Sequence, residues 1–123
     1  MKFRSILWLL VSIAFALPAA AQQPTRIWDG VFSSDQTGTN KRFVEFAKGA
    51  NVLVMHLNIA AGATSPLHAS PAVVGRVAQD AGVGRLIVSH ISQFDLDAAI
   101  AELKKFYTGP LIVGADLQCT QVQ

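Results

Sequence analysis

The stretch Leu67–Ser92, "LHASPAVVGRVAQDAGVGRLIVSHIS", contains the clearest fold signal in this chain. Ser70 can cap a helix that has Pro71 at its first position, and Gly82 can end that helix. The apolar stripe of this helix has the 3.6-residue period of a helix and consists of Val74, Val77, Ala78 and Ala81. The run that follows, Arg85–His90, is short and contains the β-branched residues Ile87 and Val88. It therefore predicts a strand that ends in histidine.

The same alternation of helix and strand continues on both sides of this unit. The stretches "RIWDGVF" (26–32), "NVLVMHL" (51–57) and "LIVGA" (111–115) predict three further strands. A first helix is expected over residues 39–48, where Thr39 can cap the start. Its predicted apolar stripe consists of Phe43, Phe46, Ala47 and Ala50. A third helix is expected to begin at Asp95 as its cap. Its predicted stripe consists of Leu96, Ala99, Ile100 and Leu103.

The predicted order is therefore β-α-β-α-β-α-β, an α/β fold with one largely parallel or mixed sheet. The strand over residues 51–57 reads as buried on both faces. Three helices with one apolar stripe each are barely enough to cover both sides of four strands. We therefore expect a piece of a larger architecture, or a protomer that needs a partner.

Residues 1–21 have the three parts of a secretory signal peptide. Lys2 and Arg4 form the basic start, Ile6–Leu17 is an uncharged core, and Ala19–Ala21 supply small residues for cleavage. The alternatives are an uncleaved anchor or a buried helix. The prediction is a mature domain of residues 22–123 in the periplasm or secreted, without a membrane segment after cleavage.

Charge and cysteine content limit the possible functions. The chain has 10 Lys and Arg against 8 Asp and Glu, and removing Lys2 and Arg4 leaves 8 against 8. A near-neutral mature chain gives no basic patch, so nucleic-acid binding is not expected. Cys119 is the single cysteine, which excludes a disulfide within one chain and a haem-attachment motif.

Four polar residues are predicted at strand ends or in the loops beside them, where α/β proteins place ligands. Asp35 follows the first strand, His56 ends the second, His68 precedes the second helix, and His90 closes the third strand. Imidazoles and carboxylates that meet at one edge suit zinc. The competing interpretation is that the histidines are ordinary polar residues and that Asp35 stabilises a turn.

Several short motifs in order resemble the C-terminal half of a metallo-β-lactamase-fold hydrolase, in the branch of ribonuclease Z and arylsulfatase-like enzymes. They are "SSDQTG", "VLVMHL", "LHASP", "RLIVSHIS" and "GPLIVGADL", and they span residues 31–117. The resemblance implies one half of an αββα sandwich. It also implies a metal-dependent hydrolase, in which metal-bound hydroxide attacks an ester or phosphoester bond of an unknown small-molecule substrate.

The resemblance also assigns roles to individual residues. Asp35 is similar to the aspartate that bridges two metal ions, and His90 to the last histidine ligand. His68 is similar to the histidine that assists the leaving group or the transition state. His56 stands where the family has a histidine followed by glutamate, but Leu57 follows it here, so His56 is assigned no role in the site.

The family's H-x-H-x-D-H motif and its further histidine ligand, which belong to the N-terminal half of the fold, do not occur in this sequence. The zinc ligand set is therefore incomplete, since open catalytic sites normally use three protein ligands. Two hypotheses follow. Either a partner chain or a second copy supplies the missing ligands, or the chain is a non-catalytic truncated half-domain that acts as a binding or dimerisation module.

Overall fold

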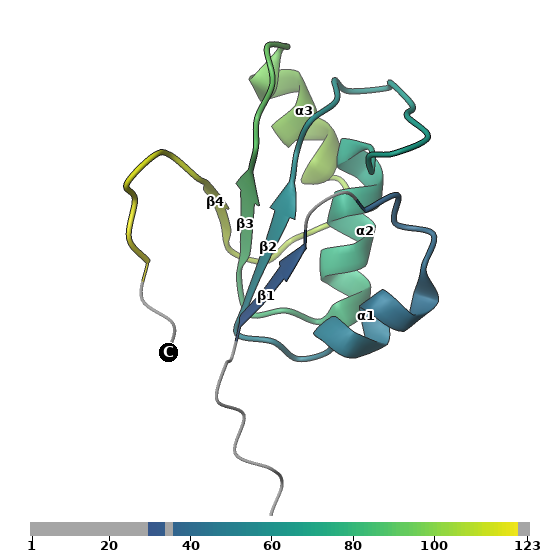
Figure 1. The fold of residues 1–123 in the computed structure, drawn as a ribbon, viewed down its shortest axis with the longest axis vertical. Coiled ribbons are helices and arrows are strands. Elements are labelled where there is room, and N and C mark those ends of the chain that lie inside the picture. The colour runs from purple at the N-terminus through teal and green to yellow at the C-terminus, as the bar shows by residue number, and fades with distance from the viewer. Residues whose placement is uncertain (1–29, 34–35, 121–123) are drawn as a thin grey trace, which may run out of the picture.

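A computed structural model describes residues 30–33 and 36–120 and shows the predicted order of elements (Figure 1). The predicted signal peptide and the start of the predicted first strand lie outside these residues. The strands and helices alternate along the chain as β1 (Gly30–Ser33), α1 (Lys41–Ala47), β2 (Val52–His56), α2 (Pro71–Ala81), β3 (Leu86–Ser89), α3 (Leu96–Leu103) and β4 (Leu111–Val113).

The four strands form one sheet in the order β1-β2-β3-β4, and all three pairings are parallel. The expectation of a mixed sheet is therefore wrong for the described part of the chain. The reason is the connection between strands. Each pair of consecutive strands is joined through one helix, which carries the chain back to the end of the sheet from which it started.

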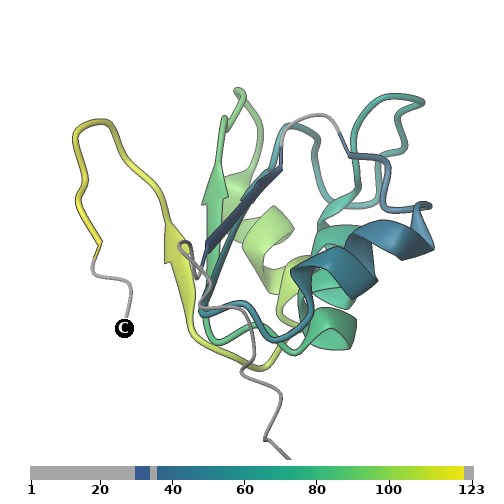
Figure 2. The same ribbon diagram turned by 60° about the horizontal axis from the view of Figure 1, so that its bottom comes forward.

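All three helices lie on the same face of the sheet (Figure 2). Right-handed crossovers between strands that pair in sequence order keep every helix on that face. The strand residues that point toward the helices are almost fully buried and form the core together with the helix stripes and with Leu57, which directly follows β2; they are Leu53, Met55, Leu86 and Val88. The prediction that the strand over residues 51–57 is buried on both faces is met only in part, because the described helices cover one side: on the other side Val52 is buried but Val54 is partly exposed.

The opposite side of the sheet is called the open face below. Its central row consists of Val54, Ile87 and Ile112, which are register partners on adjacent strands and are only partly buried. Parallel strands normally bury both faces, as their apolar sequences here would suggest. The structure therefore leaves an apolar sheet surface that none of the described helices covers.

The helix boundaries follow from their caps. Ser70 and Asp95 accept hydrogen bonds from the backbone N–H groups of Val73 and Ala98, as predicted, and Gly82 ends α2 in the left-handed conformation. The first helix differs from the prediction, because Asn40 rather than Thr39 is the cap. The Asn40 side chain accepts from the N–H of Arg42.

The predicted apolar stripe of α1 is also partly wrong. Ala47 and Ala50 are buried, but the Phe46 side chain is 70% exposed. The helix packs mainly against α2, and Phe43 and Val44 also contact the core. In the part of the chain that the structure describes, no helix is long and apolar enough to cross a membrane.

The helices α2 and α3 approach closely at Gly75. A Cβ atom on Gly75 would lie 2.5 Å from the carbonyl oxygen of Leu103 and 3.2 Å from the Cβ of Phe106. The Arg76 guanidinium lies 4.2 Å from the centre of the Phe106 ring on the outer side of this contact. A residue without a side chain is therefore required where the two helices meet.

We predict that Gly75→Ala lowers the free energy of unfolding by about 1–3 kcal/mol, because backbone atoms must move to admit the methyl group. Chemical denaturation measures this change. Gly30→Ala is the matched control, since its Cβ would meet only the carbonyl oxygen of Val52 at 3.8 Å. Equal stability of Gly75→Ala and the wild-type chain would contradict the close packing of α2 against α3.

Candidate functional site

Two histidines meet at the C-terminal end of the sheet. His56 is the last residue of β2 and pairs in register with Ser89, the last residue of β3. His90 follows Ser89 directly, so the parallel pairing brings the two histidines side by side. The Leu57 N–H donates to the Ser89 carbonyl at 2.9 Å, which extends the pairing of the two chain segments to this point.

The imidazole rings of His56 and His90 stack, with 4.5 Å between their centroids and 14° between their planes. His90 has a φ of 52°, in the left-handed region that few residues other than glycine adopt, although histidine, asparagine and aspartate enter it more often than most. The stack with His56 fixes the direction of the exposed His90 ring.

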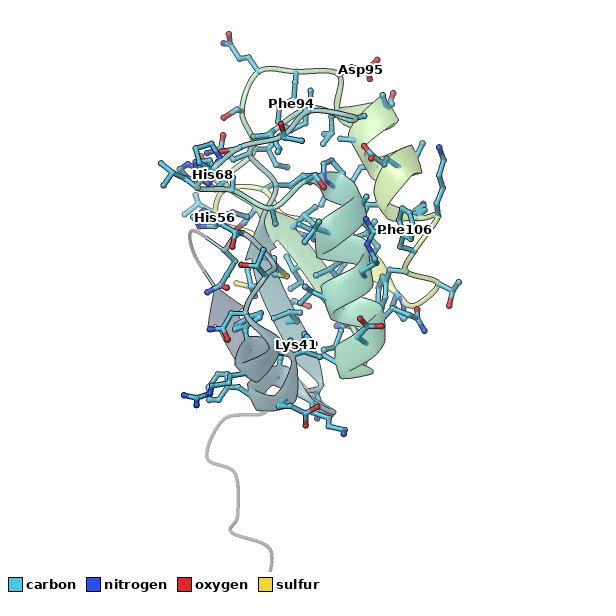
Figure 3. All side chains as sticks on the ribbon, turned by 90° about the vertical axis from the view of Figure 1, so that its right-hand side faces the viewer. Lys41, His56, His68, Phe94, Asp95 and Phe106 are labelled. Atoms are coloured by element: carbon cyan, nitrogen blue, oxygen red, sulfur yellow. The ribbon has the colours of Figure 1, made fainter. Side chains whose placement is uncertain are left out.

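His68 lies in the loop between β2 and α2, at the same end of the sheet. Its N–H and that of Leu67 both donate to the Ser65 hydroxyl, at 3.2 and 3.1 Å. The same loop is tied to α3 by a 2.8 Å hydrogen bond from the Gly62 N–H to the Glu102 carboxylate. Figure 3 shows His56 and His68 at the same end of the molecule.

The Nδ1 atoms of His56 and His68 are both buried. Farther along the same edge, the Ser92 hydroxyl donates a hydrogen bond to the Asn58 side-chain oxygen. This contact joins the loop that follows β3 to the loop that follows β2. The loops that carry the histidines are therefore held to each other and to the helical layer.

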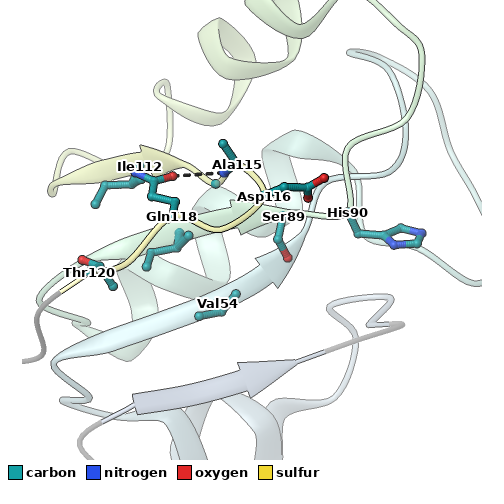
Figure 4. Close-up of a pocket in the computed structure, with 10 residues that line it drawn as sticks. Val54, Ser89, His90, Ile112, Ala115, Asp116, Gln118 and Thr120 are labelled. Atoms are coloured by element: carbon teal, nitrogen blue, oxygen red, sulfur yellow. Dashed lines mark hydrogen bonds between the residues drawn. The ribbon is translucent and has the colours of Figure 1, made fainter.

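A hollow of about 410 Å³ lies between the open face and residues 114–120, which we call the tail (Figure 4). The floor of the hollow is the apolar row Val54, Ile87 and Ile112. Polar side chains border it, and these are Ser89, His90, Asp116, Gln118 and Thr120. The Arg85 guanidinium donates to the Thr120 hydroxyl at 3.1 Å, which holds the tail against the sheet.

Two residues at this edge were given no role by the resemblance. The strand-end rule selected His56, but the resemblance left it out because leucine follows it, yet its ring contacts His90. Asp116 stands in the motif "GPLIVGADL" without an assigned role, yet it borders the hollow together with His90. Asp116 follows the end of a parallel strand, so the strand-end rule could have found it too.

The structure brings together only part of the predicted site. His90 and His68 lie at the C-terminal end of the sheet, whereas Asp35 falls outside the described residues. Within residues 30–33 and 36–120, no three side chains of His, Cys, Asp or Glu are grouped closely enough to hold a metal ion. One chain, as far as the structure describes it, does not offer a complete metal site.

The geometry of the His56–His90 pair decides whether the two rings can share one zinc ion. The lone pair of an imidazole nitrogen lies in the plane of the ring, and these two planes are stacked and nearly parallel. Tetrahedral zinc needs lone pairs that converge on one point. The two rings therefore do not fit one zinc ion together, and His90, which is the more exposed, is the better candidate ligand.

The chain was compared with known proteins. No protein-family model and no curated protein matches it. Among solved structures it is similar to the metallo-beta-lactamase fold protein YhfI from Bacillus subtilis, with a TM-score of 0.60 and 27% sequence identity. The match covers 69% of this chain and 36% of that protein, so this chain corresponds to about a third of its length. The described α/β unit thus has the fold of part of a metallo-β-lactamase-fold protein.

Proposed function

We propose that this chain belongs to an exported, metal-dependent hydrolase of the metallo-β-lactamase fold that acts on ester or phosphoester bonds. The observation that carries the proposal is His90, placed in a left-handed conformation at the end of β3 and stacked on His56. The branch of ribonuclease Z and arylsulfatase-like enzymes is the one that the sequence motifs favour. Export to the periplasm is proposed on the leader at residues 1–21 alone.

Each candidate residue has a distinct proposed role. His90 and Asp35 would be metal ligands, as the resemblance implies, and zinc is the ion that such a ligand set suits. His68 would contact the substrate and stabilise negative charge as it develops, since it lies at the same end of the sheet in a loop fixed by Ser65 and Glu102. The remaining ligands would come from outside the described residues, for example from a partner chain.

A second function is favoured by the open face. An apolar surface that is left uncovered on a folded unit marks a site of interaction. The chain would then act as a non-catalytic binding or dimerisation module, with the histidine edge retained from an enzyme. Metal binding separates the two functions.

We predict that the purified chain binds zinc with a dissociation constant in the micromolar range or below, and that His90→Ala and Asp35→Ala each weaken binding at least about tenfold. Metal analysis after dialysis and titration against a zinc indicator measure this. Asp80→Ala, which removes an exposed carboxylate of α2, is the control and should bind as the wild type. No bound zinc at micromolar concentration would rule out the hydrolase proposal.

We also predict that His56 strengthens zinc binding indirectly, by holding the His90 ring in place. His56→Ala removes the stacked ring, whereas His56→Phe keeps an aromatic ring without nitrogens. Aromatic contacts of this kind contribute about 0.5–1.5 kcal/mol, so the alanine variant should bind zinc about 2–10-fold more weakly and the phenylalanine variant close to normally. Equal loss in both variants would mean that a nitrogen of His56 is required instead.

A further inference from the structure

The hollow between the open face and the tail has the size of a small-molecule site. Its volume is about 410 Å³, and sites for small ligands usually enclose about 300–1,000 Å³. Its floor is the apolar row of Val54, Ile87 and Ile112, whose side chains are only partly buried. A concave site with an apolar floor and a few polar groups around it is the usual form of a ligand pocket.

The tail forms the wall opposite this floor, and hydrogen bonds hold it in position. The Arg85 guanidinium donates to the Thr120 hydroxyl at 3.1 Å. The Ala115 N–H donates to the Gln118 side-chain oxygen at 3.0 Å, and the Gln118 N–H donates to the Ala115 carbonyl at 3.1 Å, so these residues form a tight turn. The hollow is therefore a gap between two walls rather than an open sheet surface.

The tail also limits what can occupy the hollow. Two sheets that pack face to face lie about 10 Å apart, and the tail stands in the space that a second sheet would need. A protein surface would have to displace the tail to reach the floor, whereas a small molecule can lie beneath it. Because β3 has four residues, the floor along this strand is about 10 Å long, which suits a molecule with two fused rings.

The two ends of the hollow are polar, and one of them carries a negative charge. Figure 4 shows Ser89 and Asp116 near one end and Thr120 at the other. Among the described residues that line the hollow, Asp116 supplies a carboxylate and none is a lysine or an arginine. A carboxylate attracts a cation and repels an anion. The lining therefore favours a ligand with an ammonium group over one with a carboxylate.

We propose that this hollow binds a small molecule that has a flat apolar body and a protonated amino group. The apolar body lies on Ile87 and its register partners beneath the tail. The ammonium group lies at the end that carries Asp116 and Ser89, where a hydroxyl can accept a second hydrogen bond from it. The site needs neither a metal ion nor a second chain, so it does not depend on the functions proposed above.

The apolar floor is expected to supply most of the affinity. Asp116 is exposed, and ion pairs at exposed positions are weakened by water and salt. The amino group should therefore improve binding by only about 2–5-fold over a neutral group of similar size. The sign of this preference, rather than its size, identifies the site.

Fluorescence titration of the full chain with 1-naphthylmethylamine tests the proposal, with a chelator present so that no metal ion takes part. The matched probes are 1-naphthylmethanol, which is neutral, and 1-naphthylacetate, which is an anion. The amine is expected to bind with a dissociation constant of about 0.1–1 mM, the alcohol about 2–5-fold more weakly, and the acetate most weakly. Equal binding of all three probes, or binding of none, would overturn the proposal.

Two variants identify the group that selects the charge of the probe. Asp116→Asn is expected to remove the preference for the amine and to leave the affinity for the alcohol unchanged. Phe46→Ala removes an exposed aromatic side chain on the helical side of the sheet and should bind all three probes as the wild type does. Circular dichroism confirms that both variants are folded. An unchanged preference for the amine in Asp116→Asn would contradict the assigned charge contact.

Nuclear Overhauser contacts between the ring protons of the amine and protein methyl groups locate the bound probe. The expected contacts are those with Val54, Ile87 and Ile112. Contacts with other methyl groups instead would place the probe elsewhere and overturn the site. Sedimentation velocity tests the competing occupant, because a dimer that excludes the probe would assign the open face to a second copy and would also overturn the proposal.

Discussion

The arrangement of the described residues depends on one constraint, the handedness of the connections between parallel strands. Four strands that pair in sequence order and are joined by single helices must place all their helices on one side. The helical stripes then bury one face of the sheet, with Leu53, Leu86 and Val88 almost fully buried. The other face carries the apolar row of Val54, Ile87 and Ile112. Among the described residues, the tail lies on this side of the sheet.

The same parallel order gathers the polar residues at one edge. Every strand ends at the same side of the sheet, so residues far apart in the sequence, His56, His90 and Asp116, lie at or near one edge. His90 has a left-handed backbone at this edge, directly after the end of β3. The stack on His56 and the hydrogen bond between the loops that follow β2 and β3 hold this geometry.

The sequence was sufficient where local rules act alone. Ser70, Pro71, Gly82 and Asp95 bound their helices as their side chains predict, because capping depends only on neighbouring backbone groups. Sequence patterns failed where residues far away in the chain decide whether a side chain is buried. Hydrophobic periodicity did not reveal that Phe46 is exposed or that one sheet face is uncovered, because both depend on what lies opposite. Residue order likewise hid the contact of His56 with His90.

The incomplete site and the uncovered sheet have one common cause. Within the described residues, no three side chains of His, Cys, Asp or Glu are grouped closely enough to hold a metal ion, so the histidine edge does not form a complete metal site by itself. The apolar face beside that edge also needs a surface of similar shape. The described unit corresponds to about a third of a metallo-beta-lactamase fold protein, which has further chain beyond the matched part.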